Sequence, residues 1–403
     1  MRIAYLAGPA NAPEIYRQWS GAERQAYAGT DYMKQFLQLA EELDAECQVI
    51  TWSGERSVTR LGQFTFINRP ITTRGGAGFY LGQLWWHLKL LPALLRFRPD
   101  LLVLTGNQGF WWTLAPVRAE FLPSFHCVLW RKFGPPRLAW SFLLHLERRF
   151  ILQRCRAVVV TSHDIARQVR QMTDAKIIHH LPTYSAEQFA GLAAPRWGSQ
   201  PFRVAFVSRI EANKGVFDVM EMARRLPSVR FDICGSGGAL EQARSNAPDN
   251  VTFHGFCDQA KMAGVMGAAH VAIVPTRADC EAGFEMTCAE AILSGRPLIT
   301  SAVCPALEYL RPATIEVEPD HVEEYVAAIQ RLATDRALYE RLQTACVPLQ
   351  AQFLDLGNSW LSAMRRAIDY LPAAIPASLA LGRTGSVMAL ATLATLAGVP
   401  SDL

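Results

Sequence analysis

Short apolar runs alternate with amphipathic segments along most of the chain. In the first half, apolar runs predict strands at 2–7, 47–52, 101–105, 126–130 and 157–161, and a helical spacing of apolar positions predicts helices at 29–43, 80–96, 138–153 and 163–172. In the first of these helices, Met33, Phe36 and Leu37 fall on one side, and Thr30 or Asp31 is available as the N-cap. This alternation is typical of α/β proteins with parallel sheets.

A second alternating series follows residues 186–201, which lose both periodicities and carry Pro and Gly, as linkers do. Strands are predicted at 203–207, 230–234, 251–253, 271–274, 297–300 and 314–316. We therefore expect two domains, residues 1–185 and 202–353, joined by the linker 186–201. A last helical pattern at 359–370 lies in a segment, 354–371, beyond the second domain. Residues 372–403 form a C-terminal tail that is largely apolar.

Composition narrows the class of protein. A chain of 403 residues, half of them hydrophobic and 19% charged, has room for two globular domains. The net charge of +4 is too small to indicate a nucleic-acid partner. Nine cysteines are scattered without a Cys-x-x-Cys pair, which favours buried, reduced thiols and predicts no metal site. The N-terminus enters a strand directly, without the pattern of a signal peptide. These features predict a cytoplasmic protein.

Three apolar or aromatic segments leave their roles open. The uncharged run 387–399 is shorter than the roughly 20 residues of a bilayer-spanning helix. It is interpreted as a helix packed on the body or a partly disordered tail, with a membrane-surface or partner-binding segment as the alternative. Segments 84–98 and 130–133 combine aromatic residues with cations. They fit a helix packed on the sheet followed by a basic loop, or a peripheral contact with the inner membrane.

Two strand-to-helix junctions carry the most chemical information. After the apolar run 204–208 come Arg209, Lys214 and Gly215; after a second run, 271–275, come 282–290 and 295–299. Junctions of this kind can lie side by side at the carboxyl edge of a parallel sheet. Each helix N-terminus there offers unpaired N–H groups and a positive dipole end to an anion. Together with two cations, this arrangement suits a diphosphate.

These segments resemble a known family. Ser208–Gly215 resembles the G-R-x-x-x-x-K-G element of the GT4-type retaining glycosyltransferases, also described as glycosyl transferases group 1, and Pro275–Ser301 resembles their P-S…E-G-F-G…E-A…G-x-P-V element. The resemblance implies a GT-B fold, which has two Rossmann-like α/β domains with parallel sheets facing a central cleft. It also implies that the donor binds the second domain and that the segment 354–371 is a helix that crosses back onto the first.

The activity implied is that of a hexosyltransferase-type enzyme. It moves a sugar from a nucleotide-diphosphate donor, with UDP or GDP left open, to a glycan, a lipid-linked or a small-molecule acceptor. The family works with retention of configuration and without metal or other cofactor, commonly in bacterial envelope or exopolysaccharide synthesis. A non-catalytic glycosyltransferase-like scaffold and a GT-B nucleotide-sugar hydrolase or epimerase remain the alternatives.

The resemblance also implies residue roles. Arg209 and Lys214 would stabilise negative charge on the leaving diphosphate. Glu290 would be the second glutamate of an E-x7-E pattern and bind the ribose hydroxyls. The first glutamate is displaced, because Ala282 stands at its position. Either Glu281 or Glu285 takes over its contact with the sugar, or that carboxylate is missing, and the sequence does not decide between these.

The remaining candidates are weaker. Around the donor, the resemblance points to the loops and backbone groups of Ser208, Gly235, Ser236, Gly237, Gly283, Phe284 and Met286. A tight turn explains the Gly-Ser-Gly loop equally well, and a strand-end turn explains His254 and Gly255 as well as contact with the base does. In the first domain, Gly8 falls in a loop like the family's acceptor loop. His126 is a candidate near the transferred sugar, although a core histidine is an alternative, and His163 competes with it.

Overall fold

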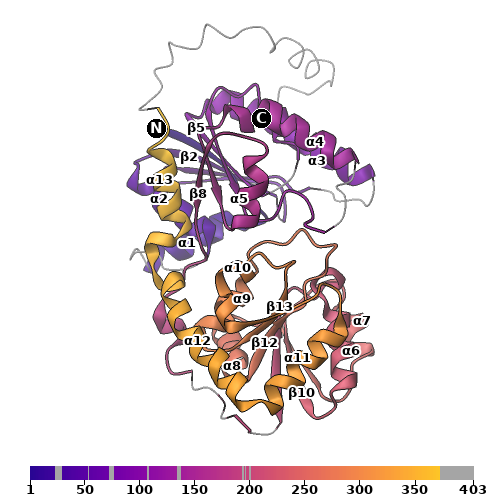
Figure 1. Cartoon of the computed structure of the whole chain (residues 1–403). Coiled ribbons are helices and arrows are strands. Elements are labelled where there is room, and N and C mark those ends of the chain that lie inside the picture. Colours follow the sequence, from indigo (N-terminus) through magenta and orange to yellow (C-terminus); the bar gives the residue numbers. More distant parts are fainter. Residues whose placement is uncertain are drawn as a thin grey trace.

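The computed structural model describes residues 1–22, 30–52, 54–71, 77–106, 109–133, 138–192, 195, 197–198 and 201–372. These residues form two α/β domains, one above the other in Figure 1. Within them, the first domain has an eight-stranded sheet of order β3-β4-β2-β1-β5-β6-β7-β8, and the second a six-stranded sheet of order β11-β10-β9-β12-β13-β14. The predicted α/β class is confirmed.

The first sheet is parallel except at one edge. Its strands are β1 (Arg2–Leu6), β2 (Glu46–Thr51), β3 (Ser57–Leu61), β4 (Phe64–Asn68), β5 (Leu101–Thr105), β6 (Glu120–Phe125), β7 (Ala157–Val160) and β8 (Lys176–His179). Only the β3–β4 pair is antiparallel among the paired strands described. The central strands are buried on both faces, which explains why they read as continuous apolar runs.

Helices cover both faces of this sheet. The helical elements of the first domain are α1 (Ala12–Ala22), α2 (Tyr32–Glu42), α3 (Ala77–Phe97), η1 (Trp111–Leu114), α4 (Leu138–Phe150), η2 (Leu152–Arg154) and α5 (His163–Arg170). One apolar core joins α3, α4 and α5 to one face, and a second joins α1 and α2 to the other. Asp31 is the N-cap of α2, where its carboxylate accepts hydrogen bonds from the Met33 and Lys34 N–H groups.

One predicted strand is wrong. The strand expected at 126–130 lies earlier, as β6, and ends at Phe125. Pro123 interrupts the apolar run of β6, and proline is unusual in a central strand. The strand was therefore not recognised from the sequence. Val128 and Leu129 are apolar because they fill the core beyond the strand's end, not because they belong to the sheet. The short β8 and the β3–β4 hairpin, whose first strand is mostly exposed, were not predicted.

The second domain is a wholly parallel sheet with helices on both sides. Its strands are β9 (Phe202–Val207), β10 (Val229–Cys234), β11 (Val251–Gly255), β12 (Val271–Val274), β13 (Leu298–Ser301) and β14 (Thr314–Val317). Its helical elements are η4 (Ala212–Lys214), α6 (Val216–Arg225), α7 (Leu240–Ser245), α8 (Gln259–Ala268), α9 (Met286–Leu293), α10 (Leu307–Leu310), η5 (Arg311–Ala313), α11 (Val322–Thr334) and α12 (Arg336–Leu354). Each strand overlaps a predicted one, because short apolar runs bounded by turns are a strong local signal.

Two connections join the domains. The predicted linker begins with a short helical turn, η3 (Ala186–Phe189). At the other end, α12 leads through η6 (Leu356–Asn358) into α13 (Trp360–Ile368), which returns to the first domain (Figure 1). The Trp360 Nε1 donates to Ser124 Oγ at 2.8 Å, and the Leu361 N–H donates to Gln35 Oε1 at 2.8 Å. The second core of the first domain therefore includes the side chains of α13.

The apolar run 387–399 and the tail from residue 373 lie outside the described residues. Across the residues that are described, no helix is both long and apolar enough to cross a membrane.

Candidate functional site

The two domains meet where β6 ends and α9 begins. Cys127 pairs with Gly283 in an isolated antiparallel bridge, and the Val128 N–H donates to the Ala282 carbonyl at 3.1 Å. A Cβ atom on Gly283 would lie 2.5 Å from the carbonyl oxygen of His126. Gly283 is therefore the residue that lets the loop before α9 approach the first domain, and His126 and Gly283 lie against each other.

The two predicted cations lie beside this contact, in the turn between β9 and α6. Gly215 has a left-handed backbone (φ +83°), and a Cβ there would meet the Pro275 carbonyl oxygen at 2.2 Å. This close approach brings the β9–α6 turn against the end of β12. Arg209 is exposed, whereas Lys214 is buried. Arg209 is close enough for its charge to act on Lys214. The two junctions therefore lie side by side.

Lys214 has a partner from the other junction. Its Nζ lies 2.5 Å from Glu285 Oε1, and both side chains are largely buried. Burial by itself lowers the pKa of Lys214, but the neighbouring Glu285 carboxylate outweighs it and holds the pKa above its usual value. The pair thus places a lysine cation at the start of α9.

Glu285 adopts a backbone conformation that is rare for its residue type. It precedes the first residue of α9 with φ 60° and ψ 83°, in the left-handed region. Non-glycine residues are uncommon there, and such strain concentrates at functional sites. The resemblance puts Glu285 where the family's E-G-F-G element ends in glycine, a residue that adopts this conformation without strain.

The other candidate carboxylate lies differently. Glu281 is exposed, and Ala282, at the position of the displaced glutamate, is buried. Of the two glutamates, Glu285 is the one bonded to Lys214. Met286, the first residue of α9, is about half exposed, while the Phe284 ring packs in the core against Tyr309 and Phe353. Phe284 is thus available to a ligand only through its backbone.

Glu290 lies on the second turn of α9 and meets a residue that sequence reasoning missed. The Tyr184 hydroxyl, from the segment that leaves the first domain, donates to Glu290 Oε1 at 3.3 Å. Burial raises the pKa of Glu290 to about 7, so its carboxyl group is poised between its two protonation states near neutral pH. The only local signal at Tyr184 is an aromatic residue ahead of the linker, which is too common to identify a site.

The predicted Gly-Ser-Gly loop lies against the loop that carries Arg209. A Cβ on Gly235 would lie 1.8 Å from the Ser208 carbonyl oxygen, and one on Gly237 would lie 2.4 Å from that of Ile210. The Ile210 N–H donates to the Ser236 carbonyl at 3.0 Å. Glycine is required here by this packing, and the exposed Ser236 lies at the surface of the loop.

The His254 side chain is bonded within the second domain. Its Nε2 lies 2.9 Å from Asp232 Oδ1, and the buried Asp232 carboxylate also binds the Arg203 guanidinium through two hydrogen bonds. The neighbouring Gly255 accepts a hydrogen bond from the Gly235 N–H at 2.8 Å. The imidazole therefore braces three strands, and Gly255 supports the Gly-Ser-Gly loop.

In the first domain, His126 directly follows β6. Its Nε2 lies 3.2 Å from Ser124 Oγ, and the centre of its ring lies 4.3 Å from that of the Tyr32 ring. Among the described residues, its buried Nδ1 has no hydrogen-bond partner. Burial lowers the pKa of His126 to about 4, so the ring is neutral near pH 7. An unpaired buried nitrogen at the domain contact suits a hydrogen bond to a ligand.

The two other first-domain candidates, Gly8 and His163, have different surroundings. Gly8 follows β1 at the same edge of the sheet, with open space around its Cα. The His163 ring stacks on that of Tyr309 from the second domain, with the ring centres 4.9 Å apart. His163 therefore supports the domain interface, and His126 is the histidine beside Gly283.

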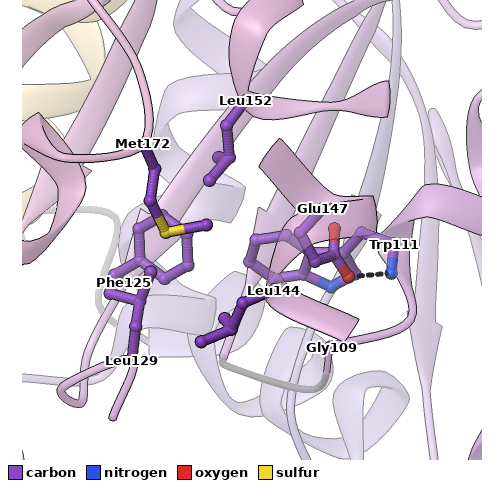
Figure 2. Close-up of a pocket in the computed structure, with 8 residues that line it drawn as sticks. All are labelled: Gly109, Trp111, Phe125, Leu129, Leu144, Glu147, Leu152 and Met172. Atoms are coloured by element: carbon purple, nitrogen blue, oxygen red, sulfur yellow. Dashed lines mark hydrogen bonds between the residues drawn. The ribbon is translucent and has the colours of Figure 1, made fainter. Parts of the chain in front are cut away.

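A separate small cavity lies inside the first domain (Figure 2). It measures about 10 Å³ and is lined by Gly109, Trp111, Phe125, Leu129, Leu144, Glu147, Leu152 and Met172. The Glu147 Oε1 accepts the Trp111 N–H at 2.5 Å, while burial raises the pKa of Glu147 to about 8. A cavity of this size holds about one water molecule, so it is not a substrate site.

Comparison with known proteins places the chain. A family model described as Glycosyl transferases group 1 matches residues 201–335, and one described as Glycosyltransferase Family 4 matches residues 34–183. A curated relative, the alpha-D-kanosaminyltransferase of Streptomyces kanamyceticus, is 26% identical over 256 residues, or 58% of this chain. The match spans 64% of that relative's length.

Solved structures share the fold over nearly the whole chain. The sucrose-phosphate synthase of Thermosynechococcus elongatus is 18% identical, with a TM-score of 0.67, and the match covers 92% of this chain and 98% of that one. A UDP-forming trehalose-phosphate synthase from Burkholderia xenovorans is 12% identical, with a TM-score of 0.66, covering 93% and 100%. HepE from Anabaena, solved in complex with UDP, is 16% identical, with a TM-score of 0.61, covering 92% and 100%.

The family models cover both domains and include the two junctions on which the resemblance rests. The expected GT-B architecture is confirmed by the structural matches. The chain therefore belongs to the GT4-type glycosyltransferases of the GT-B fold.

Proposed function

We propose that this protein transfers a sugar from a nucleoside-diphosphate donor, bound on the second domain, to an acceptor held on the first. The observation that carries the proposal is the meeting of the two junctions, where Arg209, Lys214 and the N-terminus of α9 converge beside His126. Two cations and a helix dipole at one place suit a diphosphate leaving group.

The proposed chemistry follows from these charges. Arg209 and Lys214 stabilise the negative charge that develops on the diphosphate as the bond to the sugar breaks. In the donor-free protein, Lys214 contacts Glu285. When the donor binds, its phosphate replaces the Glu285 carboxylate as the partner of Lys214. Glu285 is released toward the hydroxyls of the sugar, and Glu290 binds the ribose, with Tyr184 orienting its carboxyl group.

We further propose that the reaction retains the anomeric configuration and needs no metal. In a front-side attack, a phosphate oxygen of the donor takes the proton of the acceptor, so no separate base is required. His126, neutral and with a free Nδ1, would hold a sugar hydroxyl during this step. The cations of Arg209 and Lys214 supply positive charge where other glycosyltransferases use a divalent metal.

The donor base and the acceptor are narrower parts of the proposal. Two solved structures are named for UDP, as a product or a bound ligand, which favours UDP as the first donor base to test. A glycan, lipid-linked or small-molecule acceptor in the bacterial cytoplasm, in envelope or exopolysaccharide synthesis, follows the common setting of the family.

A thermal-shift screen with UDP, GDP, ADP and their sugars tests the donor site. A ligand at about 100 times its dissociation constant stabilises the folded state by about 2.7 kcal/mol. We expect one nucleotide series to raise the melting temperature of the wild type and to act much less on Lys214→Ala. No shift with any nucleotide would favour the scaffold alternative. Nucleotide release with water alone, and no faster with candidate acceptors, would favour a hydrolase.

A further inference from the structure

Large apolar side chains are exposed along one side of the first domain. Leu138 is 91% exposed, Leu81 67%, Phe142 63% and Trp85 43%. Leu81 and Trp85 lie on α3, and Leu138 and Phe142 on α4. We call these four residues, with Phe79 and Phe133, the apolar rim. Both helices pack on the same face of the first sheet and both contact η1, and Figure 1 shows them on the same side of the first domain.

The outward faces of the two helices carry the same order of side chains. On α3, the exposed positions include Leu81 and Trp85 in the first half and Lys89, Leu95 and Arg96 in the second. On α4, they run from Leu138 and Phe142 to His145 and Arg149. Residues four apart share one side of a helix, so the first half of each helix presents apolar side chains and the second half presents cations, together with Leu95 on α3.

The two stretches of sequence that carry the apolar rim contain no acidic residue. No Asp or Glu occurs between Glu55 and Asp100, or between Glu120 and Glu147. Glu147 itself is buried, and burial raises the pKa of its carboxyl group to about 8, so this group carries no charge at neutral pH. The cations of Lys89, Arg131 and Arg148 are therefore not offset by acids of these segments. This pairing of apolar side chains with uncompensated cations is typical of surfaces that bind anionic bilayers.

The direction of the helices places the apolar rim near the domain contact. Each of α3 and α4 connects two parallel strands, so each begins at the carboxyl edge of the first sheet. Cys127, at that same edge, pairs with Gly283 of the second domain. The first turns of α3 and α4 therefore lie at the end of the first domain that faces the second, and the basic ends lie at the far end.

We propose that this surface docks the protein on an anionic phospholipid bilayer. The apolar rim enters the interfacial layer of the bilayer. Trp85 suits this layer because its indole ring is apolar and its N–H group is polar. Lys89, Arg148 and Arg149 contact the phosphate groups of the lipids. The Lys89 Nζ lies over the Trp85 ring at 5.1 Å, so a cation and an aromatic ring are presented together. Docking by this surface holds the acceptor-binding domain at the membrane. That docking brings the active site to a lipid-linked acceptor rests on the proposed function, whereas the docking itself does not.

Flotation with lipid vesicles tests the proposal on the full chain. We expect the wild type to bind vesicles of phosphatidylglycerol and phosphatidylcholine, to bind phosphatidylcholine vesicles poorly, and to lose binding as salt is raised. The variant with Leu138→Ser and Phe142→Ser should bind the anionic vesicles with an affinity at least about tenfold lower, since two exposed apolar side chains are lost without a change of charge. Absence of wild-type binding would overturn the proposal.

The control variant replaces two other apolar residues that are also more than half exposed. Val58 lies on β3 and Val347 on α12, and they are 62% and 64% exposed. The variant with Val58→Ser and Val347→Ser should bind vesicles like the wild type. Equal losses in both variants, or unchanged binding when Leu138 and Phe142 are replaced, would show that the apolar rim is not the docking surface.

Three further measurements separate other outcomes. Circular dichroism melting should give the same transition for the wild type and both variants, since the replaced side chains are exposed. Light scattering without lipid should show one size for all three proteins; a wild-type dimer that the Leu138/Phe142 variant abolishes would make the rim a self-association surface and overturn the proposal. Donor binding by thermal shift should be unaffected in all variants, so a failure of docking and a failure of the proposed function are distinguishable.

Discussion

Lys214 Nζ and Glu285 Oε1 lie 2.5 Å apart, and this contact joins the two strand-to-helix junctions of the second domain. The lysine ends the turn after β9, and the glutamate precedes α9 in a left-handed conformation. Because both side chains are largely buried, each holds the other at the place where we expect the donor diphosphate. The contact therefore describes the donor-free state, in which a carboxylate takes the position of a phosphate.

Replacement of either cation should slow sugar transfer. We expect Arg209→Ala and Lys214→Ala each to reduce turnover by about 10²–10³, the usual effect of losing one positioned electrostatic group. Their effects on folding should differ. Arg209 is exposed, so its loss should change the free energy of unfolding by less than about 0.5 kcal/mol. Loss of Lys214 leaves Glu285 without its cation and should cost about 3 kcal/mol. Steady-state kinetics at saturating donor and urea denaturation measure both; near-normal turnover of either variant would exclude the diphosphate assignment.

The two candidate glutamates should behave unequally. Glu285→Ala should impair transfer much more than Glu281→Ala, since Glu285 contacts Lys214 and Glu281 is exposed. Glu285→Gly is the informative companion, because it removes the side chain and also relieves the strained φ of 60°. We expect it to melt higher than Glu285→Ala and to remain poorly active. If Glu281→Ala proves the more damaging variant, the loop before α9 rearranges on donor binding.

His126 should act as a neutral hydrogen-bonding group. His126→Phe keeps a ring against Tyr32 but removes both nitrogens, so transfer should fall at least about tenfold, since a hydrogen bond formed in the transition state is lost. Since the pKa of His126 is about 4, the pH profile of the wild type should show no step near pH 6.5 from this residue. His163→Phe serves as the control and should leave turnover close to normal. Equal effects of the two substitutions would contradict the assignment.

Glu147 should make stability depend on pH. Its folded pKa of about 8 lies above the ordinary value of 4.5, so between these values the folded protein keeps a proton that the unfolded chain has lost. Stability should therefore fall as pH rises through this window, by up to about 1.4 kcal/mol per pH unit. Glu147→Gln lacks this proton exchange, so its stability relative to the wild type should increase from about pH 5 to about pH 7.5 in urea denaturation. A constant difference between the two proteins would show that Glu147 is ionised in the folded state.

Transfer should survive an excess of EDTA, because Arg209 and Lys214 supply the positive charge at the diphosphate. Initial rates with and without chelator, on protein dialysed against EDTA, measure this. A complete loss that Mg²⁺ or Mn²⁺ restores would show that the leaving group depends on a metal ion.

Local pattern was sufficient for the elements whose signal lies within a few neighbouring residues. In the second domain, β9 and β12 are largely buried, mostly apolar runs, so their positions could be predicted from sequence alone. The N-cap of α2 and the left-handed Gly215 likewise follow from short-range backbone requirements, whereas Gly283 is needed for its contact with His126 of the other domain. Where a short-range signal was mixed, as at Pro123 in β6, the prediction failed and His126 was placed inside a strand instead of after it.

The contacts between distant segments were decided only by the tertiary structure. The sequence left Glu281 and Glu285 open, because a choice between them depends on where the turn after β9 lies relative to α9. Tyr184 meets Glu290 only because the linker passes beside α9. The exposure of Leu138 and Phe142 depends on which side of α4 the first sheet occupies. Periodicity records that a helix has two faces, but packing against the rest of the chain determines which groups meet and which remain in solvent.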